Sequence, residues 1–424
     1  MDGLEVFVSE LEVAGSSPDG SLQKSHVVFL PSPGIGHLTP LYELALVNQH
    51  NIRNDTKPKA LVIDIFSTDV FETCTDLSIP IYVFFTASAV LFTLSLYLLK
   101  LDREIEGEFV DLNETIKVPG CNPVRNQDAY HVVNPKSDEY KWYMLHVSKL
   151  PMVKGIFVNT WDDLEPVSLE AVKNERFFLD IPTPPVYPIG PLTKRVEPVC
   201  NEHEKEIIAW LDKQPKDSVL FIALGSGGTL SSEQLTELAY GLELSQQRFV
   251  FVVRKPSDYA AAAFFDVGSE YEEVSSYLPE GFLKRTNRVG LVVNSWAPHV
   301  VVLKHSSTGA FLSHCGWNST LESVKHGVPM IARPMYSEQR MNATVLSDEV
   351  GVAVKVPVVG DGGETVVVGR DEIAKVVREV MEGEKGKKLR CKAKELEASG
   401  RNSLSRGGSG FETLARVVES WKLN

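Results

Sequence analysis

The chain has 424 residues, of which 43% are hydrophobic and 23% charged, and its formal net charge is −13. This composition is that of a globular protein, and the length allows two domains with hydrophobic cores of their own. The acidic balance argues against a nucleic-acid-binding surface and against a polybasic membrane patch. An anionic ligand remains compatible with it, because helix dipoles and a few placed donors act locally.

The cysteines and the first residues indicate the compartment. Five cysteines lie scattered without the spacing of a metal site, at Cys74, Cys121, Cys200, Cys315 and Cys391. We therefore expect reduced thiols, no metal and a cytoplasmic location. Residues 1–25 combine acids with Gly, Ser and Pro, and no basic region precedes an apolar one. We expect a disordered extension there, and no signal peptide.

Strands and helices are predicted to alternate through the first half of the chain. Short apolar runs typical of buried parallel strands lie at His26–Leu30, Ala60–Phe66, Ile81–Phe85 and Gly155–Asn159. The stretch Ile81–Leu101 is long and nearly free of charge, which would suit a membrane span. Small residues interrupt it after Phe85, so a buried strand, a turn and a buried helix are favoured. The alternation indicates an α/β domain with a parallel sheet.

A proline-rich connector, Pro182–Pro191, marks a domain boundary. The alternation restarts beyond it, with strands predicted at Ser218–Leu224, Arg248–Val253, Gly290–Val293 and Met330–Ala332. The chain ends in a helix, Phe411–Trp421, with one apolar face. We expect four parts: an extension (1–25), a first domain (26–190), a second domain (191–400) and a C-terminal helix (401–424).

Two residues of the first domain could share one chemical task. His37 follows the first strand and its glycine-bearing turn, and Asp64 interrupts an otherwise apolar strand. Each by itself is more often structural, but a buried carboxylate is costly unless it is paired. Paired with His37, Asp64 would fix the imidazole tautomer, and the other ring nitrogen could then deprotonate a hydroxyl. Asp69 is the second choice for the carboxylate. The turn lacks a full dinucleotide fingerprint, because Thr39 stands where the third Gly would fall.

The richest stretch runs from Trp296 to Gln339. Its middle reads as a short strand, a tight turn at Gly316 and a helix with small polar residues in its first turn: Asn318, Ser319 and Thr320. Such residues can cap a helix, and the N–H groups of the first turn can bind an anion. An ordinary capped helix leaves the neighbouring polar and aromatic residues unexplained: His314, Trp317, Asn318 and Glu322. These residue types suit a nucleotide diphosphate that carries a sugar.

The segment from Trp296 to Gln339 resembles the nucleotide-sugar signature box of plant family 1 UDP-glycosyltransferases. The resemblance extends from about His26 to the end of the chain. It implies the GT-B fold, in which two doubly wound, Rossmann-like α/β domains face a cleft. Residues 26–190 would bind the acceptor, residues 191–400 would bind the UDP-sugar, and the C-terminal helix would pack back on the first domain. The catalytic dyad of the family falls on His37 and Asp64.

The resemblance also assigns the donor site. Uracil would be held by Trp296 and Ala297, and the ribose hydroxyls by Glu322. The diphosphate would be held by Ser226, His314, Asn318 and Ser319. The sugar would be held by Trp317, Glu338 and Gln339, the last of which goes with glucose. Ser88 would place a hydroxyl toward the sugar, and Phe66 would line the acceptor pocket. His299 stands where the box usually has a Gln that contacts ribose.

One departure from the family concerns the first domain. His37 and Asp64 lie 27 positions apart, where the family has a longer segment with two further strand–helix units. A strand–helix–strand unit needs about 30 residues, so one crossover fits. In a sheet of order 3-2-1-4-5-6 the loss leaves strand 1 beside strand 4, and the pair could still meet. We expect a shortened sheet, an exposed apolar edge along the first strand and a reduced acceptor pocket.

These features predict a UDP-glucose-dependent, inverting glucosyltransferase that forms β-O-glucosides of small phenolic acceptors. The segments Gly225–Thr229 and Asp138–Trp142 most resemble the hydroquinone and phenylpropanoid group. We expect UDP-glucose as co-substrate, no cofactor, no metal, no nucleic acid, no membrane span and a monomer. The alternative is a UDP-sugar-binding pseudoenzyme, impaired by the short segment between His37 and Asp64. That segment could also reflect a transcript variant.

Overall fold

The computed structural model divides into two compact units. Unit 1 comprises residues 1–194 and 399–424, and unit 2 comprises residues 195–398. The structure describes residues 7–13, 23–32, 35–47, 58–104, 118, 120, 137–174, 181–195, 201–258, 273–356 and 366–423. The turn residues Pro33 and Gly34 therefore lie outside the described residues, as do Cys121 and Cys200.

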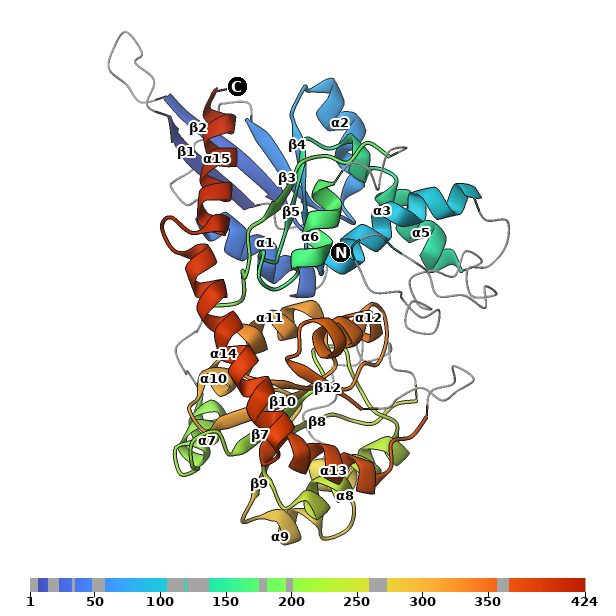
Figure 1. The fold of residues 1–424 in the computed structure, drawn as a ribbon, viewed down its shortest axis with the longest axis vertical. Coiled ribbons are helices and arrows are strands. Elements are labelled where there is room, and N and C mark those ends of the chain that lie inside the picture. Colours follow the sequence, from blue (N-terminus) through green and yellow to red (C-terminus); the bar gives the residue numbers. More distant parts are fainter. Residues whose placement is uncertain are drawn as a thin grey trace. The chain divides into compact units, whose positions relative to one another are not determined.

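Unit 1 contains a six-stranded sheet of order β1-β2-β3-β4-β5-β6 (Figure 1). The strands are β1 (Phe7–Val13), β2 (Gln23–Leu30), β3 (Ala60–Asp64), β4 (Ile81–Phe85), β5 (Gly155–Val158) and β6 (Val186–Pro188). The helices are α1 (Ile35–Val47), α2 (Phe71–Asp76), α3 (Ala89–Glu104), α5 (Asp138–Val147), α6 (Pro166–Lys173) and α15 (Ser409–Leu423), with the short 3-10 turns η1 (Thr68–Val70) and η3 (Leu150–Met152). Strands β2 to β6 are parallel, so the α/β class is confirmed for this unit.

Strand β2, the first strand predicted from the sequence, pairs with β3, as the short segment between His37 and Asp64 requires. Residues Val27–Leu30 of β2 lie in parallel register with Ala60–Ile63 of β3, which brings the ends of these two strands to one edge of the sheet. The other edge of β2 is paired, whereas the sequence predicted an exposed edge there and a disordered extension before it. Strand β1, within residues 1–25, pairs with it antiparallel, from Phe7↔Phe29 to Val13↔Gln23. The physical reason is that an unpaired strand edge gains a complete ladder of hydrogen bonds from any nearby extended segment.

The charge-free stretch after Ile81 forms a strand and a helix, as predicted. Strand β4 is buried at all five positions, and three residues separate its end from the start of α3. Within the described ranges, no helix combines the length and the apolar character needed to cross a membrane.

The C-terminal helix α15 belongs to the core of unit 1. Its Val417 and Trp421 are buried in one hydrophobic cluster with residues of β2, β3, β4 and β5. The Trp421 indole packs edge-on against Tyr82, with ring centroids 5.2 Å apart. The last residues of the chain therefore support the same sheet that carries the N-terminal strands.

Unit 2 contains a parallel six-stranded sheet of order β12-β11-β10-β7-β8-β9 (Figure 1). The strands are β7 (Val219–Ala223), β8 (Arg248–Val253), β9 (Gly290–Asn294), β10 (Thr308–Ser313), β11 (Met330–Ala332) and β12 (Ala353–Lys355). The helices are α7 (Glu202–Leu211), α8 (Ser232–Ser245), α9 (Phe282–Thr286), α10 (His299–Lys304), α11 (Trp317–Lys325), α12 (Gln339–Thr344), α13 (Arg370–Met381) and α14 (Glu384–Leu404), which ends in unit 1, with the 3-10 turn η6 (Val274–Ser276) and the π-helical turn η7 (Val345–Glu349).

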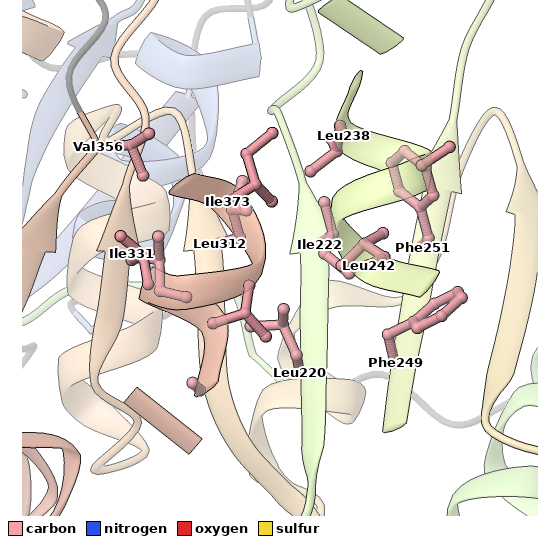
Figure 2. Close-up of a cluster of buried hydrophobic side chains, with 14 of the residues drawn as sticks. Leu220, Ile222, Leu238, Leu242, Phe249, Phe251, Leu312, Ile331, Val356 and Ile373 are labelled. Carbon is pink, nitrogen blue, oxygen red and sulfur yellow. The ribbon is translucent and has the colours of Figure 1, made fainter. Parts of the chain in front are cut away.

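Alternate strand residues of unit 2 meet the helices on one face of its sheet. Figure 2 shows Leu220 and Ile222 of β7 and Phe249 and Phe251 of β8 gathered with Leu238 and Leu242 of α8. Leu312, Ile331 and Ile373 extend the same cluster toward α13. Burying one such side chain contributes roughly 1.5–3 kcal/mol. This packing fixes the strand directions, and with them the loops at the carboxyl edge.

Candidate active site

In unit 1, three polar residues meet at the carboxyl ends of neighbouring parallel strands. Ser32 follows β2, Asp64 ends β3 and Thr86 follows β4. Parallel register places these ends side by side, and open α/β sheets bind ligands at this edge. His37, in the first turns of α1, lies over the same edge.

The predicted pair of His37 and Asp64 is in direct contact. Asp64 Oδ2 lies 2.7 Å from His37 Nδ1. The carboxylate is fully buried, whereas the His37 side chain is 31% exposed. The other oxygen, Oδ1, accepts from Ser32 Oγ at 2.6 Å and from the Phe66 N–H at 3.0 Å. These donors satisfy a carboxylate that would otherwise be costly to bury. Asp64 can therefore hold the His37 tautomer whose Nδ1 carries the proton.

The other predicted site residues of unit 1 lie at different distances from this pair. Asp69, the second choice for the carboxylate, lies exposed in η1. Ser88 is fully buried, and its Oγ accepts from the Leu91 N–H at 3.2 Å, so it caps α3. Thr86, which the sequence analysis did not single out, reaches the pair: its Oγ1 lies 3.1 Å from His37 Nδ1. The signal that could have identified Thr86 is its place directly after β4, at the same edge of the sheet as Asp64. Phe66 lies beside His37, with ring centroids 5.2 Å apart.

The turn that carries Thr86 is held by a buried acid. Glu165 accepts from the N–H groups of Ala89 and Val90, at 3.0 and 3.1 Å, at the start of α3. A carboxylate at a helix N-terminus is stabilised by both the hydrogen bonds and the helix dipole. Glu165 thereby fixes the strand-to-helix turn next to His37.

In unit 2, left-handed backbone gathers at the carboxyl edge of the sheet. Gly225 (φ +77°), Ser295 (φ +64°), Cys315 (φ +65°) and Ser337 (φ +57°) lie in the loops after β7, β9, β10 and β11. A non-glycine residue held in this conformation costs about 1–3 kcal/mol, and such residues cluster at ligand sites. The strain therefore marks the loops that flank most of the predicted donor residues.

His314 lies between two glycines. A Cβ on Gly225 would come within 2.5 Å of the imidazole Cε1 and Nε2, and a Cβ on Gly316 within 2.4 Å of Nε2. Burial lowers the pKa of His314 to about 3, with smaller contributions from His299 and then Arg254. The imidazole is therefore neutral and can meet a phosphate as a hydrogen-bond donor only. Among the described residues, none forms a hydrogen bond with its Nδ1.

Helix α11 begins directly after Gly316. The N-cap of α11 is Gly316, and no side chain caps it within the described part of the chain. Asn318, Ser319 and Thr320 lie inside the first turn, so the prediction that small polar residues cap this helix is wrong. The first N–H groups of a helix have no intrahelical partner. The positive end of the dipole of α11 therefore suits an anion.

The predicted uracil residues follow β9. Trp296 is 48% exposed, and Ala297 is buried. His299 begins α10 and packs edge-on against Phe221 and Phe311, at 5.3 and 6.2 Å between ring centroids. Desolvation lowers its pKa to about 4. His299 is therefore a neutral ring that packs on the core.

Arg254 links the loops around these residues, and no sequence motif points to it. Its guanidinium donates to the Ser295 carbonyl at 3.1 Å and to the Ser226 carbonyl. It also lines a pocket together with Gly225, Thr229 and His299. The signal that could have identified Arg254 is its position directly after β8, at the same carboxyl edge.

The last predicted donor residues occupy α11 and the start of α12. Gln339 is buried, and its Oε1 accepts from the N–H groups of Met335 and Tyr336 at 3.0 and 3.1 Å. Only its amide N–H groups can therefore serve a ligand. Glu338 lies half-buried beside Ser337, and Glu322 lies half-buried on α11, whose Trp317 is buried.

Comparison with known proteins gives consistent matches. A family model described as UDP-glucoronosyl and UDP-glucosyl transferase matches residues 158–389. The anthocyanidin 3-O-glucosyltransferase 5 of Manihot esculenta is 44% identical over 86% of this chain and 74% of its own length. The hydroquinone glucosyltransferase of Rauvolfia serpentina is 44% identical over 87% of this chain and 76% of its own length. The structure of Phytolacca americana UGT2 complexed with UDP-2fluoro-glucose and pterostilbene has a TM-score of 0.81 and 35% identity, over 93% of this chain and 99% of that one.

Proposed function

Because the chain belongs to the UDP-glucoronosyl and UDP-glucosyl transferase family and is a UDP-glycosyltransferase of GT-B fold, we propose that it glucosylates a small phenolic hydroxyl. The donor is UDP-glucose and the product a β-O-glucoside. Two relatives named for hydroquinone and anthocyanidin, and a structural neighbour that holds pterostilbene, support a phenolic acceptor. The proposal includes a cytoplasmic monomer that needs neither a metal nor a further cofactor.

The contact between His37 and Asp64 carries the proposal. Asp64 accepts from Nδ1, which leaves Nε2 as the ring nitrogen that can take a proton. The buried carboxylate would stabilise the imidazolium that forms when His37 takes the proton of the acceptor hydroxyl. Ser32 and the Phe66 N–H hold the carboxylate in place.

The transfer of glucose from UDP to a phenol balances with His37 as the only proton acceptor. The acceptor oxygen loses its proton to His37 Nε2 and forms a bond to the anomeric carbon of glucose. The bond from that carbon to the diphosphate breaks, and its electron pair leaves with UDP. Attack opposite the leaving group inverts the α-linked donor to a β-glucoside. General base catalysis of this kind contributes about 10²–10⁴-fold in rate.

Unit 2 supplies the features that suit UDP. The N-terminus of α11 can stabilise the charge that develops on the diphosphate, and His314 can donate to one of its oxygens. Trp296 offers a half-exposed aromatic face for a base. Glu322 and Glu338 carry carboxylates that can accept from sugar hydroxyls.

Purified protein incubated with UDP-glucose and a panel of phenols tests the proposal. We expect glucoside formation that falls about 10²-fold or more in His37→Ala, and that persists in EDTA. UDP-glucose binding by calorimetry without any turnover would contradict the proposal, as would equal product from wild type and His37→Ala.

A further inference from the structure

A buried cation follows β11 at the carboxyl edge of the sheet of unit 2. Arg333 comes directly after Ala332, the last residue of β11, and is 8% exposed. Arginine is almost never buried to this degree unless it is paired. Within the described ranges, however, no residue accepts a hydrogen bond from the Nε of Arg333.

The charge of Arg333 is not compensated by an acid of the described residues. Burial lowers the pKa of Arg333 to about 10, and no neighbouring charge in the described part of the chain contributes. The guanidinium therefore stays protonated at physiological pH. By contrast, hydrogen bonds satisfy the buried carboxylates of Asp64 and Glu165. Because a buried charge without a partner destabilises a folded chain, Arg333 indicates that an anion from outside the chain binds there.

Arg333 lies one strand away from His314. Parallel register pairs Ser313 of β10 with Ala332 of β11, so these two strands end side by side. His314 follows β10, Arg333 follows β11, and the Arg333 N–H donates to the Ser313 carbonyl at 2.9 Å. Neighbouring strands lie about 4.8 Å apart. The cation therefore borders the turn that leads into the N-terminus of α11.

Arg333 adds a full positive charge to the features of this edge that suit a diphosphate. The His314 imidazole is neutral, and the N-terminus of α11 carries only about half a charge. Arg254 already donates to the carbonyls of Ser226 and Ser295. The negative charge on the diphosphate grows when its bond to the sugar breaks. A buried guanidinium attracts such a charge strongly, because salt screens it little.

We propose that Arg333 is the cation that binds the diphosphate of the donor and stabilises the leaving UDP. This inference rests on the proposed function and adds one residue to its donor site. It predicts two opposite effects of removing the charge: the free protein becomes more stable, and UDP binds more weakly. An arginine with a structural role alone would lose stability on replacement.

Thermal unfolding without ligand measures the first effect. Arg333→Met removes the charge and keeps an unbranched side chain. Its unfolding midpoint should rise by about 2–8 °C, because an apolar side chain replaces an unpaired buried cation. The matched control is Arg248→Met, which removes a cation from the amino end of β8 in the same sheet and should change the midpoint less. A midpoint that falls in Arg333→Met would show a partner within the chain and overturn the proposal.

Calorimetry with UDP measures the second effect. UDP should bind about 30- to 300-fold more weakly to Arg333→Met, and equally well to wild type and Arg248→Met. Arg333→Lys keeps the charge and should lose less affinity than Arg333→Met. Uridine, measured by competition with UDP, should bind equally to wild type and Arg333→Met, because it carries no phosphate. Equal proportional losses for UDP and uridine would overturn the pairing, as would an unchanged UDP affinity.

A donor whose sugar carries a carboxylate separates two kinds of anion. UDP-glucuronate and UDP-glucose share the diphosphate, so Arg333→Met should weaken the binding of both about equally. A loss confined to UDP-glucuronate would assign Arg333 to the sugar carboxylate and overturn its pairing with the diphosphate.

UDP binding is measured without an acceptor, which separates this inference from the proposed function. If wild type binds UDP but forms no phenolic glucoside, and Arg333→Met binds UDP more weakly, the pairing stands and the proposed function fails. If wild type glucosylates a phenol and Arg333→Met binds UDP as tightly as wild type, the pairing alone is refuted.

Discussion

Gly225→Ala tests whether the packing of His314 controls donor binding. Gly225 has φ +77°, and an added Cβ would lie 2.5 Å from the His314 Cε1. Two effects follow: a left-handed alanine costs about 1–2 kcal/mol, and the imidazole must move by roughly 1 Å to reach a normal carbon–carbon contact. A displacement of that size breaks a hydrogen bond of normal length. Loss of a hydrogen bond to a charged group costs about 1.5–3 kcal/mol, so UDP should bind about 10- to 100-fold more weakly.

Gly351→Ala is the matched control. Gly351 has φ +76°, and an added Cβ would meet no atom within 4 Å. Both variants should lower the unfolding midpoint by about 2–8 °C, because they share the backbone strain. Calorimetric titration with UDP should show weaker binding in Gly225→Ala only. Equal UDP affinities in the two variants would refute the reasoning that His314 must keep its place to hold the donor.

Three further predictions concern stability. Glu165→Ala should lower the free energy of unfolding by about 1–3 kcal/mol, because two buried N–H groups of α3 lose their acceptor. The control Glu170→Ala, on the exposed face of α6, should change this free energy little. Denaturant titration measures both variants. His314 and His299 should make stability fall with acidification: both have folded-state pKa values, about 3 and about 4, below the ordinary histidine value of 6.5. Above about pH 6.5 they are neutral in both states, and below it only the unfolded chain gains protons, so the free energy of unfolding should decrease as pH falls toward 4. Denaturant titrations at pH 7 and pH 5 should show a smaller decrease in His314→Gln, and an identical decrease would argue against a buried neutral ring. A chain that begins at Gln23 should scatter light within hours, because removing β1 uncovers the edge of β2, whereas a chain lacking only residues 1–6 should stay clear.

Much of the fold follows from local patterns. Apolar runs set the parallel strands, and the carboxyl ends of those strands then meet at one edge of each sheet. For that reason the contact between His37 and Asp64 could be predicted despite their separation in sequence. The buried strand and helix after Ile81 could also be predicted from the sequence, because small residues interrupt the apolar stretch there.

The residues that escaped prediction depend on contacts between segments. Thr86 and Arg254 act through hydrogen bonds to other loops, and a single hydroxyl or guanidinium after a strand has no signature of its own. Ser88 resembles Thr86 in type but caps a helix instead. The pairing of β1 was missed because the composition of residues 1–25, with its acids, Gly, Ser and Pro, does not show that a short segment within it can pair with the free edge of β2.

The rate of glucose transfer in three proteins tests the central claim, that Asp64 orients His37 as the base for a phenolic hydroxyl. Initial rates with UDP-glucose and a phenol should be compared for wild type, Asp64→Asn and Asp69→Asn. Asp64→Asn should lose about 10²–10⁴-fold in kcat, since an amide cannot stabilise the imidazolium, while the exposed Asp69→Asn should retain the wild-type rate. Equal rates in Asp64→Asn and Asp69→Asn would contradict the account.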